Sequence, residues 1–178
     1  VKLADYLLEH FEDKKNGGFY FTADNHETLI QRPKFFTDES IPPGNAVAAH
    51  ALNRLGLLLA EPKYIIAAER TLKAAWEMMN QAPSAHNSMI HSLEEFLQPP
   101  DVLILRGETA EIEKWQHAVI EKNYDPHRLS YKIPHDMADL PVALQNYRYD
   151  NKTTAYVCRG TQCLAPIYSL EDLLQQLS

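Results

Sequence analysis

The sequence predicts a mainly α-helical chain that ends in a smaller α/β part. Through the first 98 residues, apolar side chains recur every three or four positions, which is the period of an α-helix. The period stops at Pro99-Pro100, and Val102–Leu105 follows as a continuous apolar run, typical of a strand buried on both faces. Helix-like and strand-like segments then alternate to the end. We therefore expect helical hairpins in residues 1–98 and a small α/β unit in residues 99–178.

The chain opens in an amphipathic helix over Val1–Phe11, whose apolar residues recur at a spacing of four. Because the first residue is valine and the helix is already under way, we expect the chain to be a piece of a longer protein. Asn16-Gly17-Gly18 then supplies a turn that suits positive φ. Phe19–Phe21 follows as a short aromatic strand or hairpin arm.

Three further helices are expected before Pro99. Asn45 is the expected N-cap of a helix over residues 46–60. Pro62 suits the first turn of the next helix, and Pro83-Ser84 begins the last one. Short connections of this kind are typical of antiparallel helical hairpins. His50, His91 and His117 fall within expected helices, where we expect them to pack rather than to catalyse.

The sequence pattern of residues 99–178 predicts a small parallel or mixed sheet. Residues 108–122 have the pattern of a helix, and residues 129–133 and 153–158 have the pattern of strands. Ser169 is the expected N-cap of a closing helix. A strand, a helix and a second strand in this order are typical of a crossover between parallel neighbours.

Charge and composition narrow the classes of partner. The chain has 17 basic and 24 acidic residues, a net charge of −7, so no nucleic acid partner is expected. It contains no apolar run of about 18 residues, so no membrane span is expected. Two cysteines do not make a disulfide scaffold in a chain of 178 residues, which favours a cytoplasmic location.

Cys158 and Cys163 have four residues between them, whereas redox pairs of the CxxC type have two. A structural zinc site would need two further ligands at short spacing. We therefore expect reduced thiols, no metal and no cofactor, with a disulfide as the alternative.

The densest polar stretch is Thr22–Asn45, a long loop between the Gly-Gly turn and the second helix. Carboxylates, a histidine and an arginine that converge on a pocket could perform acid/base chemistry on a sugar. The alternative is a solvated loop whose charges pair among themselves. The candidate residues of the loop are Asp24, His26, Glu27, Arg32, Lys34, Asp38 and Asn45.

Two long motifs resemble one family. They are Gly17–Glu27, followed by Arg32-Pro33-Lys34 and Asp38–Asn45, and Ala155–Cys158, followed by Cys163 and Pro166. The family consists of the thioredoxin-domain-containing proteins related to spermatogenesis-associated protein 20, and the resemblance covers almost the whole chain. The sequence departs from the family at Asn25, where a second aspartate is frequent, and at Pro43, where serine is common.

This resemblance implies a longer protein with an N-terminal thioredoxin-like domain. An (α/α)6 toroid, similar to N-acylglucosamine 2-epimerases and six-hairpin glycosidases, would follow it. The present chain would be the last hairpins of an incomplete toroid plus the α/β unit, and the missing segments would be its partners. Apolar surface that those segments normally cover is expected to make the fragment self-associate.

The implied function is a carbohydrate-directed pocket that performs epimerisation or hydrolysis in the intact parent. A glycosidase would use carboxylates from Asp24, Glu27 and Asp38, whereas an epimerase would use His26 as a base, with His86. The expected substrate-binding residues are Arg32, Lys34, Asn45 and His86. The alternative is a non-catalytic scaffold that supports the thioredoxin-like domain.

Overall fold

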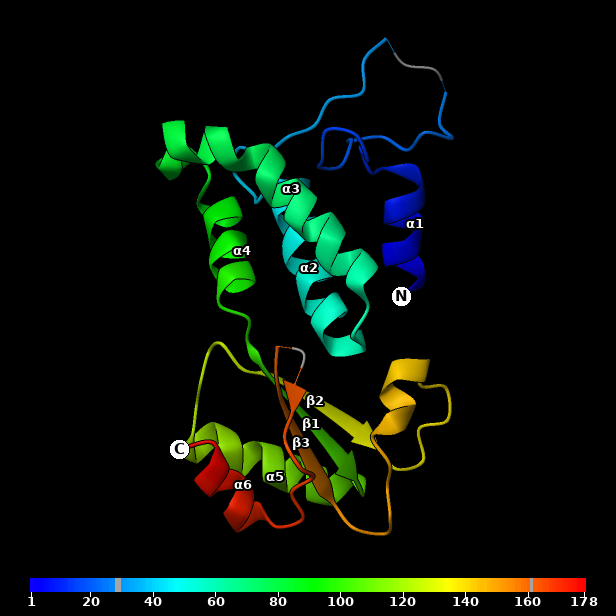
Figure 1. Ribbon diagram of the computed structural model, residues 1–178, viewed down its shortest axis with the longest axis vertical. Coiled ribbons are helices and arrows are strands. Elements are labelled where there is room, and N and C mark those ends of the chain that lie inside the picture. Colours follow the sequence, from blue (N-terminus) through cyan, green and yellow to red (C-terminus); the bar gives the residue numbers. More distant parts are fainter. Residues whose placement is uncertain (28–29, 161) are drawn as a thin grey trace. The chain divides into compact units, whose positions relative to one another are not determined.

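The computed structural model describes residues 1–27, 30–160 and 162–178, which divide into two compact units (Figure 1). The helical unit is Val1–Gln98 and the α/β unit is Pro99–Ser178. Across the described residues there are six α-helices and one four-stranded sheet. None of the described helices combines the length and apolar character that crossing a bilayer requires.

The helical unit is built around a hairpin of two long helices, which lie side by side in Figure 1. Its α-helices are α1 (Lys2–His10), α2 (Gly44–Leu59), α3 (Pro62–Gln81) and α4 (Asn87–Leu97). In α3, the apolar residues that recur every three or four positions are all buried, namely Tyr64, Ala68, Leu72, Ala75 and Met79. The described residues contain four such helices, fewer than the six hairpins of a toroid.

The expected start of the fourth helix is wrong by a few residues. Pro83–Ala85 forms a separate 3₁₀ turn, and α4 begins only at Asn87. The chain leaves helical geometry at His86, where φ is −137° and ψ is 30°. Proline tolerates the first turn of either kind of helix, so it could not by itself distinguish the two.

The expected N-cap of α2 is also wrong. Pro43 occupies the N-cap position, and Asn45 lies inside the first turn of the helix with its side chain buried. The amide of Asn45 bonds to backbone groups of the preceding loop instead of capping α2. These buried backbone groups need partners and are more costly to leave unpaired than the exposed end of a helix.

The α/β unit carries a mixed sheet in the strand order β2-β1-β3-β4. The strands are β1 (Asp101–Gly107), β2 (Leu129–Pro134), β3 (Thr154–Arg159) and β4 (Gln162–Cys163). β1 and β2 are parallel neighbours joined through α5 (Thr109–Lys122), which confirms the expected crossover. β3 pairs antiparallel with both β1 and β4.

The core of the α/β unit lies between the sheet and its two helices. Leu103 and Leu105 of β1 pack against Ile112 and Trp115 of α5. Leu173 of α6 (Leu170–Gln176) joins the same cluster. Ser169 accepts a hydrogen bond from the backbone N–H of Asp172, so its expected role as the N-cap of α6 is confirmed. The four residues 102–105 are at most 3% exposed, as a strand buried on both faces requires.

Candidate functional site

The polar loop is organised around a carboxylate that precedes it, Asp13. The Nζ of Lys34 lies 2.7 Å from Asp13 Oδ2, and the Tyr20 hydroxyl donates to the same oxygen at 3.0 Å. The backbone N–H of Asn16 donates to Asp13 Oδ1 at 2.9 Å. Lys34 also donates to the carbonyl of Gly17 at 2.8 Å. The structure therefore uses Lys34, an expected substrate-binding residue, to hold the Gly-Gly turn.

Arg32 and Asp24 lie beside the end of α1. The Arg32 guanidinium donates to the carbonyls of Thr22 and His10, at 2.6 and 3.1 Å, and lies over the Tyr20 ring. The Asp24 carboxylate is 2.8 Å from His10 Nδ1, and this hydrogen bond lowers the pKa of Asp24 below its ordinary value. Both side chains thus fasten the loop to α1.

Two further candidates meet at the start of α4. Asp38 Oδ2 accepts a hydrogen bond from the backbone N–H of Ser88 at 2.9 Å, where a carboxylate is favoured by the helix dipole. His86 Nδ1 lies 2.8 Å from the carbonyl oxygen of Ala82, and its Nε2 lies 3.4 Å from the Thr37 hydroxyl. His86 is only 5% exposed. These contacts connect the loop to α4.

The remaining loop candidates differ in burial. His26 and Glu27 are exposed, and residues 28 and 29 lie outside the described residues. Asn45 is 3% exposed: its Oδ1 accepts from the Phe19 N–H at 2.6 Å, and its Nδ2 donates to the carbonyls of Phe19 and Phe35. The contacts thus place Asp24 and Arg32 at the end of α1, Lys34 at the Asp13 turn, and Asp38 and His86 at the start of α4. Asn45 joins the start of α2 to the backbone of Phe19 and Phe35. Their catalytic and binding roles stay predictions.

Replacement of Asn45 by alanine should lower the free energy of unfolding by roughly 2–3 kcal/mol, because buried backbone groups of Phe19 and Phe35 lose their partners. Urea denaturation followed by circular dichroism measures the change. Asn87→Ala is the matched control, since its amide bond to Ser84 is exposed. An unchanged midpoint for Asn45→Ala would contradict this structural role of Asn45 and would favour its role in ligand binding.

A cavity of about 450 Å³ lies between α2 and α4, and we refer to it as the α2/α4 pocket. Its walls are formed by Pro42, Ala46, Val47, His50, Ala51, Asn87, Ser88, His91 and Ser92. The expectation that His50 and His91 only pack within helices is therefore incomplete. The sequence carries no local signal for this pocket, because its walls come from segments about 40 residues apart.

A buried ionic group lies beside the pocket. The Glu95 carboxylate, whose side chain is 5% exposed, accepts two hydrogen bonds from Arg54 Nε, at 2.9 and 3.0 Å, and one from Nη2 at 2.5 Å. His50 Nε2 lies 3.8 Å from Glu95 Oε2, an electrostatic contact rather than a hydrogen bond. The His50 ring stacks on the His91 ring with 5.3 Å between centroids.

His50 is the titratable group of the pocket with a displaced pKa. Burial of the imidazole lowers the pKa of His50, and the Glu95 carboxylate opposes this in part. The ring is therefore neutral at pH 7 and able to accept a proton. An imidazolium formed there would be stabilised by Glu95, whose charge is otherwise shared with Arg54. The Nε2 atom of His50 faces Glu95, and the buried Nδ1 atom has no hydrogen-bond partner among the described residues.

Cys158 and Cys163 are joined in a disulfide, so the expectation of reduced thiols is wrong. The pair is directly opposed in the β3–β4 ladder, and this register brings two side chains together whatever the number of residues in the turn. The disulfide also removes the free-thiol argument on which the cytoplasmic location rested.

Comparison with known proteins gives one distant similarity. No family model matches the chain. Spermatogenesis-associated protein 20 of Homo sapiens is 26% identical over 174 residues, which make up 94% of this chain. The chain spans 22% of the length of that relative. The resemblance seen in the motifs is therefore confirmed as a distant similarity to this human protein over most of the chain.

Proposed function

We propose that the chain is the last part of a carbohydrate-directed protein with an (α/α)6 toroid, and that the α2/α4 pocket is its contribution to the sugar site. The observation that carries the proposal is a pocket with almost wholly apolar walls and the His50 ring in its lining. Ala46, Val47 and Ala51 of α2 contribute to the apolar surface. A sugar ring has a face of C–H groups, which suits such a wall.

Epimerisation is favoured over hydrolysis by the groups at the pocket. Glycoside hydrolysis uses two carboxylates that flank the scissile bond. No aspartate or glutamate is among the described residues that line this pocket, and nearby Glu95 is engaged by Arg54. Epimerisation by proton removal and return needs a base of moderate pKa, which a neutral imidazole supplies. His50 is the proposed base, in place of His26 or His86.

Exposed apolar side chains support the view that further segments complete the structure. Leu3 on α1 is 87% exposed, and Trp76 on α3 is 54% exposed. Exposed apolar side chains that lie together mark surfaces where another segment or chain can pack. The missing hairpins of the parent are the proposed cover, and a second copy of the chain would serve as a substitute.

A sugar panel tests the proposal on the 178-residue chain. We expect a hexose or an N-acylhexosamine to show saturation-transfer signals and a millimolar affinity, with an affinity roughly tenfold weaker in His50→Ala. Ala51→Trp should abolish binding by filling the pocket. His117→Ala is the matched control, because this histidine is exposed on α5 in the other unit.

The other outcomes discriminate between the alternatives. Loss of binding in Asp24→Asn and Glu27→Gln, with His50→Ala unaffected, would place the site in the polar loop. A chain that binds no sugar of the panel would favour the non-catalytic scaffold.

Because the pKa of His50 lies below its ordinary value, binding that needs the neutral ring should persist at about pH 6.5 and be lost on further acidification.

A further inference from the structure

The β3–β4 hairpin holds its disulfide between two very different environments. Cys158 lies on β3, which is paired on its other side with β1, and is 6% exposed. Cys163 lies on the two-residue edge strand β4 and is exposed. The backbone N–H of Leu164 donates to the carbonyl of Val157 at 2.9 Å, so the two strands remain paired beside the sulfurs. The accessible sulfur is therefore that of Cys163.

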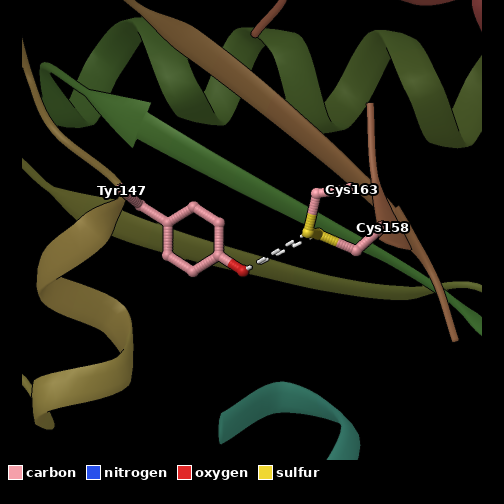
Figure 2. Close-up of a disulfide and its surroundings, with 3 residues drawn as sticks. All are labelled: Tyr147, Cys158 and Cys163. Carbon is pink, nitrogen blue, oxygen red and sulfur yellow. Dashed lines mark hydrogen bonds between the residues drawn. A yellow bond between two sulfur atoms is a disulfide. The ribbon is translucent and has the colours of Figure 1, made fainter. Parts of the chain in front are cut away.

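A phenol hydroxyl points at the two sulfurs (Figure 2). Tyr147 Oη lies 3.6 Å from Cys158 Sγ and 3.9 Å from Cys163 Sγ. The ring is held edge-on against Tyr156 of β3, with 4.9 Å between centroids. Burial raises the pKa of Tyr147, so the hydroxyl keeps its proton at neutral pH. It can therefore donate a hydrogen bond to a sulfur that becomes a thiolate.

We propose that Cys158–Cys163 is a thiol–disulfide exchange site for a dithiol reductant, with Tyr147 as the hydrogen-bond donor to the departing thiolate. A thiolate of the reductant attacks Cys163 Sγ and forms a mixed disulfide. The S–S bond breaks, and its electron pair goes to Cys158 Sγ, which accepts the hydrogen bond from Tyr147 and then a proton from solvent. The second thiolate of the reductant then attacks the reductant sulfur that is bonded to Cys163. A disulfide forms within the reductant, and Cys163 leaves as a thiolate and is protonated. Two electrons pass from the dithiol to the cystine.

The pairing of the strands selects a dithiol over a monothiol. After the first step, the ladder still holds Cys158 opposite Cys163, so the Cys158 thiolate can attack the mixed disulfide and expel the incoming thiol. A monothiol reductant is therefore released unchanged, and the Cys158–Cys163 disulfide forms again. A dithiol competes because its second sulfur is also intramolecular.

Quenched reduction of the native chain tests the proposal, with dithiothreitol and glutathione as probes. Alkylation with N-ethylmaleimide and intact-mass analysis follow the fraction reduced. We expect dithiothreitol to reduce the folded chain, and Tyr147→Phe to be reduced roughly tenfold more slowly than wild type at pH 7. Tyr149→Phe is the matched control, because its hydroxyl bonds to Glu108 and not to sulfur. Melting temperatures of the oxidised proteins verify that each variant is folded.

A second measurement does not depend on the tyrosine variant. In Cys158→Ser, Cys163 should form a stable mixed disulfide with oxidised glutathione, whereas in Cys163→Ser the buried Cys158 should react far more slowly. Equal reactivity of the two cysteines would overturn the assignment of the attacked sulfur. A folded Tyr147→Phe with the wild-type rate would overturn the role of the phenol. Reduction that occurs only on unfolding would overturn the exchange site itself.

Discussion

Replacement of Asp13 by alanine should lower the free energy of unfolding of the helical unit by roughly 3–5 kcal/mol. The Asp13 carboxylate is 7% exposed and is paired with the Lys34 ammonium, which is itself 20% exposed. Removal of the carboxylate leaves this cation and the Tyr20 hydroxyl without the oxygen that they share. Truncation of one partner of a buried ion pair is far more costly than loss of an exposed pair.

The acid dependence of stability gives a second readout of the same group. The hydrogen bond from Lys34 holds the pKa of Asp13 well below the ordinary value of 3.8. The unfolded chain therefore binds a proton at a higher pH than the folded chain does. The contribution of Asp13 is fully present above about pH 4 and is lost as the pH falls towards the folded-state pKa.

Urea denaturation at pH 7 and at pH 3 measures both effects. Wild type should lose more stability between the two pH values than Asp13→Asn, which cannot titrate. Asp24→Ala is the control, since that carboxylate is 53% exposed and its hydrogen bond to His10 lies at the surface. A wild-type midpoint for Asp13→Ala would mean that the Lys34 contact is dispensable and that the turn is held by its backbone alone.

The charged residues of the polar loop form hydrogen bonds to the fold itself, although their composition predicts a catalytic site. The charged residues of the loop have the composition of a catalytic loop, and composition cannot distinguish a substrate from the fold as the recipient of their hydrogen bonds. Arg32 bonds to backbone carbonyls, and Lys34 bonds to Asp13 and to Gly17. These partners lie far along the chain from the residues that they hold. A sequence pattern does not encode such pairings.

The elements themselves could be predicted because their signals are local. The inner face of α3 follows from a spacing of three or four, and β1 follows from four consecutive apolar residues. The α2/α4 pocket could not be predicted, because His50 and His91 come together only when α2 packs on α4. The disulfide could not be predicted for a similar reason, since strand register rather than spacing brings Cys158 opposite Cys163.

Replacement of Gly17 by alanine should cost roughly 3–4 kcal/mol, from backbone strain and a steric clash together. Gly17 has a φ of +78°, and a Cβ at this position would overlap the carbonyl oxygen of Arg70 on α3. The clash is with backbone inside a helix, so no side-chain rotation can relieve it. The turn after α1 therefore requires glycine where it passes α3.

Two other glycines separate these causes. Gly160 has a φ of +57°, and a Cβ added to it would meet no atom within 4 Å, so Gly160→Ala should show the strain alone, about 1–2 kcal/mol. Gly44 begins α2 in open space with no such φ, so Gly44→Ala should stabilise the chain by about 0.4–1 kcal/mol. Urea denaturation of the three variants gives the comparison. If Gly17→Ala costs no more than Gly160→Ala, the turn can move away from α3 and the contact is not what fixes it. If the cost exceeds that of Gly160→Ala, the turn after α1 is fixed against α3 by the shape of its backbone as well as by Asp13.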